Sequence, residues 1–364
     1  MRFKTLLESG RKFGASDIHI VAGLPPVFRI DGAIILTERA PLSDVEIREL
    51  IYSILNDEQK QSLEREKELG FSHLDPDFGR SRVTVYYSNA RPEMSVRLCQ
   101  ERVLSAEELH LPEFVESFTW LTSGLVVITG PTGMGKTTTM NYIIDRINSQ
   151  RRCKIITIED PLEFTHTHRK SIVVQQEVHT DTHSFRRALV HALRQDPDVI
   201  AIGEMRELET MQTALNAAET GHLVLATLHT PDATQTVERV ISVFPPHQQE
   251  QVRFQFANTL QAAVAQKLLP RAVGPGRALA CEILVATTAV RSIIRSGETH
   301  KLYSVIQTGQ VHKMQTMDQA LLDLYYKGEI TYDTALNNAT HPNFIESRSG
   351  TPPQPNHNQT KPPL

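Results

Sequence analysis

Gly130-Pro-Thr-Gly-Met-Gly-Lys136-Thr137 is the stretch that decides the fold, because it has the pattern G-x-x-x-x-G-K-[ST]. It directly follows the apolar run Leu125-Val-Val-Ile-Thr129 and continues into TTTMNYIIDRI, which is compatible with a helix. A buried strand, a glycine turn and a helix in this order are what a phosphate-binding P-loop requires, since backbone N–H groups and the positive end of the helix then face the anion. The sequence therefore predicts that the chain binds a nucleoside triphosphate.

The residues of this loop have distinct expected roles. Lys136 should reach the β- and γ-phosphates, and Thr137 should offer its hydroxyl to Mg²⁺. A glycine-containing loop can match the G-x-x-x-x-G-K-[ST] pattern by chance, but such a match is much rarer when a strand precedes the pattern and a helix follows it. The expected nucleotide-binding residues are Gly130, Pro131, Thr132, Gly133, Met134, Gly135, Lys136, Thr137 and Thr138.

Composition limits the other classes of function. A length of 364 residues suggests two or three domains, and 40% hydrophobic residues suffice for their cores. The formal net charge of -4 gives no general attraction to nucleic acid, so no nucleic-acid partner is expected. The sequence contains no apolar run of about 18 residues, as a membrane span needs, and no signal-peptide pattern at its start. We expect a cytoplasmic protein that meets the membrane only through partners.

The pattern of apolar residues changes along the chain and predicts its organisation. An early region mixes helical and strand-like runs, with a hairpin turn at Asp31-Gly32. A later region has short apolar runs separated by helices, which is typical of a parallel sheet. The predicted parts are an α+β domain at 1–100, a linker at 101–120, an α/β core at 121–285, a helical region at 286–344 and a disordered, proline-rich tail at 345–364.

Polar residues follow four apolar runs of the predicted core. The P-loop follows the first run, Glu159-Asp160-Pro161-Leu162-Glu163 follows Lys154–Ile158, Gly203-Glu204 follows Val199–Ile202, and His229 follows Leu223–Leu228. In open parallel sheets the ligand binds beyond the carboxyl ends of the strands. A site for nucleotide hydrolysis at this edge is therefore the simplest explanation.

Hydrolysis requires a divalent cation and an oriented water molecule. Glu204 is expected to hold Mg²⁺ and Glu163 to polarise the attacking water, although the two roles could be exchanged. His229 is the candidate for sensing the γ-phosphate, and Lys136 completes the predicted catalytic set with Glu163 and Glu204. His222 lies at the opposite end of the same strand and is expected to support an interface or a helix-strand turn.

These motifs together resemble the PilT family of type IV pilus retraction ATPases, within the wider secretion ATPase superfamily. The similarity runs from SDIHIVAGLPPVFRIDG to IQTGQVHKMQTMDQALLDL, and Ala289-Val-Arg-Ser-Ile-Ile-Arg295 looks like the AIRxLIR motif of that family. Two departures stand out. Met134 replaces the usual small residue, and Thr137 replaces the common serine but keeps its hydroxyl.

The resemblance implies a homohexameric ring in which each subunit has a PAS-like N-terminal domain and a RecA-like ATPase domain. It implies that Arg82 and Arg97 from the N-terminal domain reach the nucleotide phosphates, whereas Arg91 matches only with a one-residue shift. ATP with Mg²⁺ would drive domain rotation that acts on an inner-membrane pilus platform protein, from the cytoplasmic face of the bacterial inner membrane. Twitching motility would depend on this motor.

Other functions remain open on the sequence. The nearest are an ATPase of a type II, type IV or conjugative pilus secretion system, and a pilus extension motor. Extension motors of the family generally have a longer N-terminal region and a paired C-x-x-C insertion, which this sequence lacks. A non-hydrolysing regulatory subunit is disfavoured by Lys136, Glu163 and Glu204, and a nucleic-acid translocase by the net charge.

Overall fold

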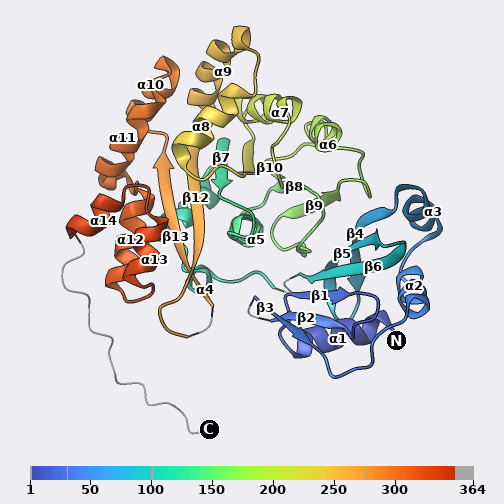
Figure 1. The fold of residues 1–364 in the computed structure, drawn as a ribbon. Coiled ribbons are helices and arrows are strands. Elements are labelled where there is room, and N and C mark those ends of the chain that lie inside the picture. Colours follow the sequence, from blue (N-terminus) through green and yellow to red (C-terminus); the bar gives the residue numbers. More distant parts are fainter. Residues whose placement is uncertain (1, 31, 100–101, 275, 349–364) are drawn as a thin grey trace. The chain divides into compact units, whose positions relative to one another are not determined.

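The computed structural model describes residues 2–30, 32–99, 102–274 and 276–348 (Figure 1). The chain forms two compact units, of which the first contains Met1–Val103 together with Asp160–His166. The second contains Leu104–Glu159 and Thr167–Leu364. No helix within the described ranges is both long and apolar enough to cross a membrane.

The first unit is an α+β structure built on one antiparallel sheet, as the mixed pattern predicts. Its six strands lie in the order β3-β2-β1-β6-β5-β4. The predicted hairpin joins β2 to β3, with Ile30 paired to Ala33 and Gly32 at a φ of 85°, while Asp31 lies outside the described residues. The elements are α1 (Phe3–Lys12), β1 (Asp17–Ile20), β2 (Val27–Ile30), β3 (Ala33–Leu36), α2 (Asp44–Tyr52), α3 (Asp57–Glu66), β4 (Glu68–Asp75), β5 (Gly79–Ser88) and β6 (Arg91–Leu98).

The second unit contains a seven-stranded sheet in the order β13-β12-β7-β11-β10-β8-β9. Every residue of β7, β10 and β11 is buried, as expected for central strands that are covered on both faces. The elements of the sheet region are β7 (Gly124–Thr129), α5 (Lys136–Gln150), β8 (Lys154–Glu159), β9 (Ile172–Glu177), α6 (Phe185–Ala192), β10 (Val199–Ile202), α7 (Leu208–Glu219), β11 (Leu223–Leu228), α8 (Ala233–Ser242), α9 (Pro246–Thr259), β12 (Leu260–Pro270) and β13 (Arg277–Val285).

The prediction of a parallel sheet is correct from β7 to β12 and wrong for β13. Strand β13 runs antiparallel to β12, with Pro270 paired to Arg277. The physical reason is the short connection between them, because a parallel partner needs a crossover of a dozen or more residues. Strand β9, parallel to β8, is a further strand that the apolar pattern does not predict.

The region after β13 is helical, as predicted, and lies along the β12–β13 edge of the sheet (Figure 1). Its predicted end at residue 344 is four residues too early, because Ile345 is buried within the last helix. Residues 349–364 of the predicted tail lie outside the described residues. The elements are α10 (Thr288–Ser296), η2 (Thr299–Lys301), α11 (Leu302–Thr308), η3 (Gln310–His312), α12 (Met317–Tyr326), α13 (Tyr332–Asn338) and α14 (Pro342–Arg348).

The segment predicted as a linker folds onto the second unit. It contains α4 (Ala106–Leu109) and the 3₁₀ helix η1 (Glu113–Trp120), whose Val115 and Phe118 are buried. The Arg146 guanidinium on α5 donates to the Glu116 carboxylate at 3.1 Å. Apolar burial and this ion pair hold the segment in place, so it is not a free connector.

Glu282 on β13 is a carboxylate that is only 3% exposed. Its Oε1 accepts a hydrogen bond from the Ala233 backbone N–H at 2.8 Å, and its Oε2 accepts one from the Met317 N–H at 3.2 Å. These donors are the first residues of α8 and α12. One side chain therefore binds the N-termini of two helices that lie far apart in the sequence.

The stability of the second unit should fall with rising pH because of this group. Burial raises the pKa of Glu282 from 4.5 to about 7, with the charges of Asp232 and Asp318 also raising it and the two backbone N–H donors lowering it. The folded state therefore binds the proton more tightly than the unfolded state, and this contribution is complete below pH 4.5 and is lost as pH rises through 7. We expect the loss to reach about 2 kcal/mol between about pH 5 and pH 8.

Urea unfolding of the wild type and of Glu282→Gln at several pH values measures this contribution. As pH rises, the unfolding free energy of the wild type should fall relative to that of Glu282→Gln. Glu177→Gln is the matched control, since Glu177 is also a buried carboxylate of the second unit, 4% exposed, and accepts a hydrogen bond from the Thr180 hydroxyl, whereas Glu282 binds two helix starts. Parallel pH curves for wild type and Glu282→Gln would contradict the prediction.

Candidate active site

The predicted P-loop connects β7 to α5 with the required geometry. Gly130, Gly133 and Gly135 have φ values of 140°, 80° and 79°, which side-chain-bearing residues rarely adopt. Gly135 is the N-cap of α5, and no side chain caps this helix. The first backbone N–H groups of α5 are therefore left to bind a ligand, and the helix dipole favours an anion there.

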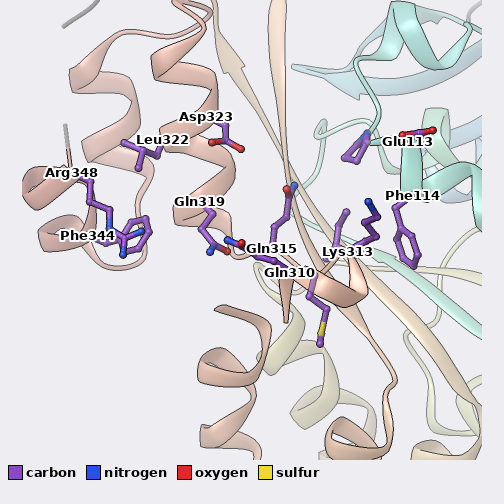
Figure 2. Close-up of a pocket in the computed structure, with 13 residues that line it drawn as sticks. Glu113, Phe114, Gln310, Lys313, Gln315, Gln319, Leu322, Asp323, Phe344 and Arg348 are labelled. Carbon is purple, nitrogen blue, oxygen red and sulfur yellow. The ribbon is translucent and has the colours of Figure 1, made fainter. Parts of the chain in front are cut away.

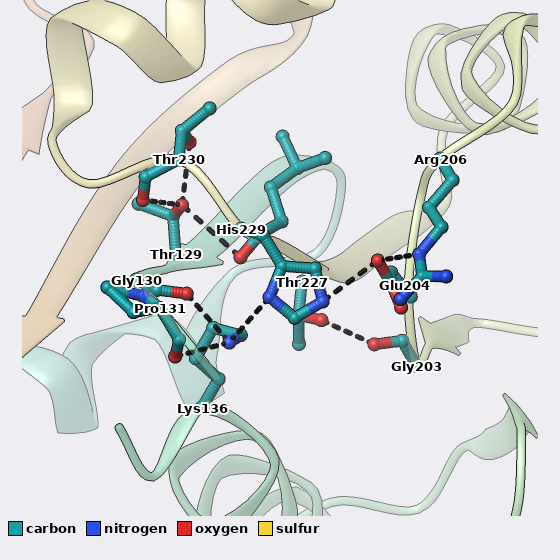
Figure 3. Close-up of polar contacts among 11 residues, drawn as sticks. Thr129, Gly130, Pro131, Lys136, Gly203, Glu204, Arg206, Thr227, His229 and Thr230 are labelled. Carbon is teal, nitrogen blue, oxygen red and sulfur yellow. Dashed lines mark hydrogen bonds and ion pairs between the residues drawn. The ribbon is translucent and has the colours of Figure 1, made fainter. Parts of the chain in front are cut away.

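The three predicted side chains Lys136, His229 and Glu204 lie in one hydrogen-bonded row (Figure 3). Lys136 Nζ is 3.1 Å from His229 Nδ1, and His229 Nε2 is 2.9 Å from Glu204 Oε1. Lys136 Nζ also donates to the carbonyl oxygens of Gly130 at 2.7 Å and Pro131 at 2.9 Å. The carboxyl ends of β7, β11 and β10 bring these residues together, as the positions of the residues after each strand predict.

The donors and acceptors in this row define the tautomer of His229. An ammonium group has only donors, so Nδ1 must accept from Lys136 and the ring proton must lie on Nε2, where it is donated to Glu204. A phosphate that approaches Lys136 would compete with His229 for the same ammonium. The row can therefore rearrange when an anion enters the P-loop.

The loop after β11 is also tied to the P-loop strand through hydroxyl groups. Thr129 Oγ1 donates to the Thr230 carbonyl at 2.6 Å (Figure 3). Thr230 Oγ1 lies 2.7 Å from Thr236 Oγ1 in α8. The Thr227 hydroxyl donates to the Gly203 carbonyl, which joins β11 to the residue before Glu204. These contacts fix the backbone on both sides of His229.

Glu204 has a second partner that the sequence did not single out. The Arg206 guanidinium forms an ion pair with the Glu204 carboxylate (Figure 3). The sequence signal that could have identified Arg206 is its position two residues after Glu204. Arg206 can hold the carboxylate in place while His229 moves.

Other contacts that the sequence did not predict brace the P-loop from β12 and β13. Arg277 donates to the Gly133 carbonyl at 3.1 Å, and the Met134 sulfur accepts from the Leu268 N–H at 3.1 Å. Gly130 lies so close to the Gln266 carbonyl oxygen that an added Cβ would overlap it. No sequence signal links these residues, because more than 130 positions separate them along the chain.

Three further predicted residues, Arg82, Arg97 and Glu163, lie in the first unit. Arg82 on β5 and Arg97 on β6 are directly paired across the two strands and are both exposed. Arg97 donates to the Asp17 carboxylate at 2.9 Å. Opposed like charges cost stability in a sheet, and the Asp17 carboxylate offsets this cost at Arg97. Glu163 belongs to the segment Asp160–His166 of the same unit and is partly buried.

His222 lies at the start of β11, away from the row of Lys136, His229 and Glu204. Its Nδ1 donates to the Ala217 carbonyl at 2.9 Å. This contact closes the turn between α7 and β11, which is one of the two roles expected for His222 from the sequence.

A parallel-stranded core with a P-loop after its central strand, and with acidic and imidazole side chains at the neighbouring strand ends, defines a RecA-like P-loop ATPase. Residues 91–275 match the family described as "Type II/IV secretion system protein". The chain is 43% identical over 342 residues to the type IV pilus retraction ATPase PilT of Pseudomonas aeruginosa, covering 94% of this chain and 99% of that protein. It is 40% identical to the type IV pilus ATPase PilU of the same organism, covering 95% of this chain and 90% of PilU.

A solved structure of the pilus retraction motor PilT with bound ADP superimposes with a TM-score of 0.89 at 42% identity. The match covers 95% of this chain and 99% of that one. The chain therefore belongs to the PilT family of type IV pilus retraction ATPases, and its activity is ATP hydrolysis. The family, fold class and ATPase activity predicted from the sequence are confirmed.

Proposed function

We propose that the chain is a motor that converts ATP hydrolysis into retraction of a type IV pilus, and thereby drives twitching motility. The row Lys136–His229–Glu204 is the observation that supports this most directly, because it joins the phosphate-binding loop to two neighbouring strands. The proposal extends to this chain what the names of its PilT relatives say of them.

In the proposed cycle each predicted residue has one task. Lys136 and the P-loop amides bind the phosphates of ATP, and His229 leaves Lys136 when the γ-phosphate arrives. Glu163 orients the attacking water molecule, and Arg82 and Arg97 neutralise charge that develops on the phosphoryl oxygens. Because Glu163 and both arginines belong to the first unit, rotation of that unit during the cycle would switch hydrolysis on and off.

Mg²⁺ fits the residues of the second unit. Thr137 in the first turn of α5 and Glu204 offer hard oxygen ligands, which Mg²⁺ prefers. Among the described residues, no group of three or more His, Cys, Asp and Glu side chains could hold a metal by itself. Mg²⁺ typically uses one or two protein oxygens together with phosphates and water. When bound, the ion would neutralise phosphate charge.

We further propose that six copies form a ring at the cytoplasmic face of the inner membrane, where the ring turns or pulls a pilus platform protein. A ring would allow closure of one subunit to be felt by its neighbours. The ring, its location and the platform protein are inferred from the family, because the net charge and composition of the chain do not identify the protein on which the motor acts.

Deleting the gene in its native host tests the direction of the motor. We expect an excess of surface pili together with lost surface movement, because assembled pili would no longer be withdrawn. Electron microscopy counts the pili, and spreading on agar measures movement. A plasmid copy of the wild type should restore both, whereas bald deletion cells would indicate pilus extension or assembly instead of retraction.

A further inference from the structure

A cavity of about 730 Å³ lies in the second unit next to the first turn of α12 (Figure 2). Glu113 and Phe114 of the segment before the core line one side, and Leu322 and Phe344 of the helical region line the other. The residues that line it do not include the P-loop, Glu204 or His229. The cavity therefore lies at the junction between the segment that leads into the core and the C-terminal helices.

A continuous set of contacts connects the P-loop to this junction. Lys136 contacts His229, and Thr129 contacts Thr230. Three residues after Thr230, the backbone N–H of Ala233 begins α8 and donates to Glu282 at 2.8 Å. His229 is thus only four residues along the chain from Ala233, whose N–H binds this buried carboxylate.

Glu282 continues the connection toward the cavity. Its second oxygen accepts from the Met317 N–H at 3.2 Å, at the start of α12. Ile283, the residue after Glu282, lines the cavity, and so do Gln315 and Gln319 on either side of Met317. The same carboxylate therefore contacts Ala233, where α8 begins after the sensing loop, and Met317, which lies between two residues that line the cavity.

The burial of Glu282 makes these two contacts interdependent. A backbone N–H that loses its partner in a buried site carries a desolvation penalty, so each helix start should follow the carboxylate when it shifts. Both oxygens belong to one planar group on a strand in the sheet, so a displacement of one oxygen displaces the other.

We propose that Glu282 is a positioning residue that passes nucleotide-dependent movement of the loop after β11 to α12 and to the cavity beside it. This rests on the proposed sensing role of His229. Since Glu113 and Phe114 line the same cavity, the movement reaches the segment through which the chain enters the ATPase core.

Hydrogen exchange of the full-length protein, measured by mass spectrometry with and without a non-hydrolysable ATP analogue, tests the proposal. In the wild type we expect the analogue to change exchange in peptides covering the first turns of α8 and α12. In Glu282→Gln the response of α8 should remain and that of α12 should be lost, because glutamine offers one acceptor where the carboxylate offers two. A purely structural role would change basal exchange but leave the nucleotide response of α12 intact.

Three further variants complete the test. Glu177→Gln, another buried carboxylate of the same unit, should keep both responses. In His229→Ala the responses of both α8 and α12 to the analogue should be lost. Retention of both responses would refute the sensing role of His229, but it would not contradict the link through Glu282. If Glu282→Gln does not fold, Ala233→Pro is the second variant, because proline removes the N–H donated to Glu282. Proline is compatible with the first helical position and with the extended backbone of Asp232, and circular dichroism must show that its ring is accommodated at this buried site. An unchanged α12 response in the folded variant overturns the proposal.

Discussion

Lys136→Ala should lower the rate of ATP hydrolysis about 10³-fold, which is the size of effect seen when one strong electrostatic contact to a transition state is removed. The P-loop carbonyls of Gly130 and Pro131 hold the ammonium group of Lys136 at the entrance of α5. Alanine leaves no positive charge for the β- and γ-phosphates, whereas the backbone cradle remains. Phosphate release by the purified protein at saturating ATP measures the effect.

Lys301→Ala is the matched control for Lys136→Ala. Lys301 is a half-exposed lysine of the same unit whose ion pair with Glu298 lies at the surface. Its removal should leave turnover unchanged. Turnover of Lys136→Ala within about tenfold of the wild type, with the fold intact by circular dichroism, would show that Lys136 is not the main phosphate ligand.

Gly130→Ala should destabilise the second unit by about 3 kcal/mol or more and abolish nucleotide binding. The φ of 140° at Gly130 is open almost only to glycine, and the new Cβ would overlap the backbone carbonyl of Gln266 on β12. Strand β12 is hydrogen-bonded to β13 on one side and to β7 on the other, which restrains it, so the P-loop must distort instead.

Gly133→Ala is an informative comparison because it lies in the same loop. Its φ is 80°, and nothing lies within 4 Å of an added Cβ. The expected cost is about 1 kcal/mol from backbone conformation alone. Thermal unfolding and titration with a fluorescent ADP analogue compare the two variants, and equal losses at both positions would contradict the assignment of steric overlap at Gly130.

The parts of the structure that could be predicted depend on short-range sequence signals. The P-loop is recognisable because eight adjacent residues carry its whole pattern. Glu204 and His229 could be placed at one edge because each lies within two residues of the end of a buried strand. Periodicity and adjacency are sufficient for such features, since parallel strands align their carboxyl ends.

The features that were missed depend on contacts between distant parts of the chain. Arg277 supports Gly133 from a strand that is itself antiparallel to its neighbour, and nothing near either residue indicates the other. In the sequence, Glu282 is a charged residue within an otherwise apolar strand. Its contacts with Ala233 and Met317 form only in the folded chain. The roles of Glu163, Arg82 and Arg97 remain predictions, because the structure by itself does not test them.

The assignment of Asp160–His166 to the first unit has a consequence for the evolution of this ATPase. The chain passes between the two units three times, at 103/104, 159/160 and 166/167. A gene fragment that ends at codon 103 would encode an N-terminal unit that lacks seven of its own residues, including Glu163. Exchange of the N-terminal unit between relatives by simple recombination should therefore fail unless this short segment is exchanged with it.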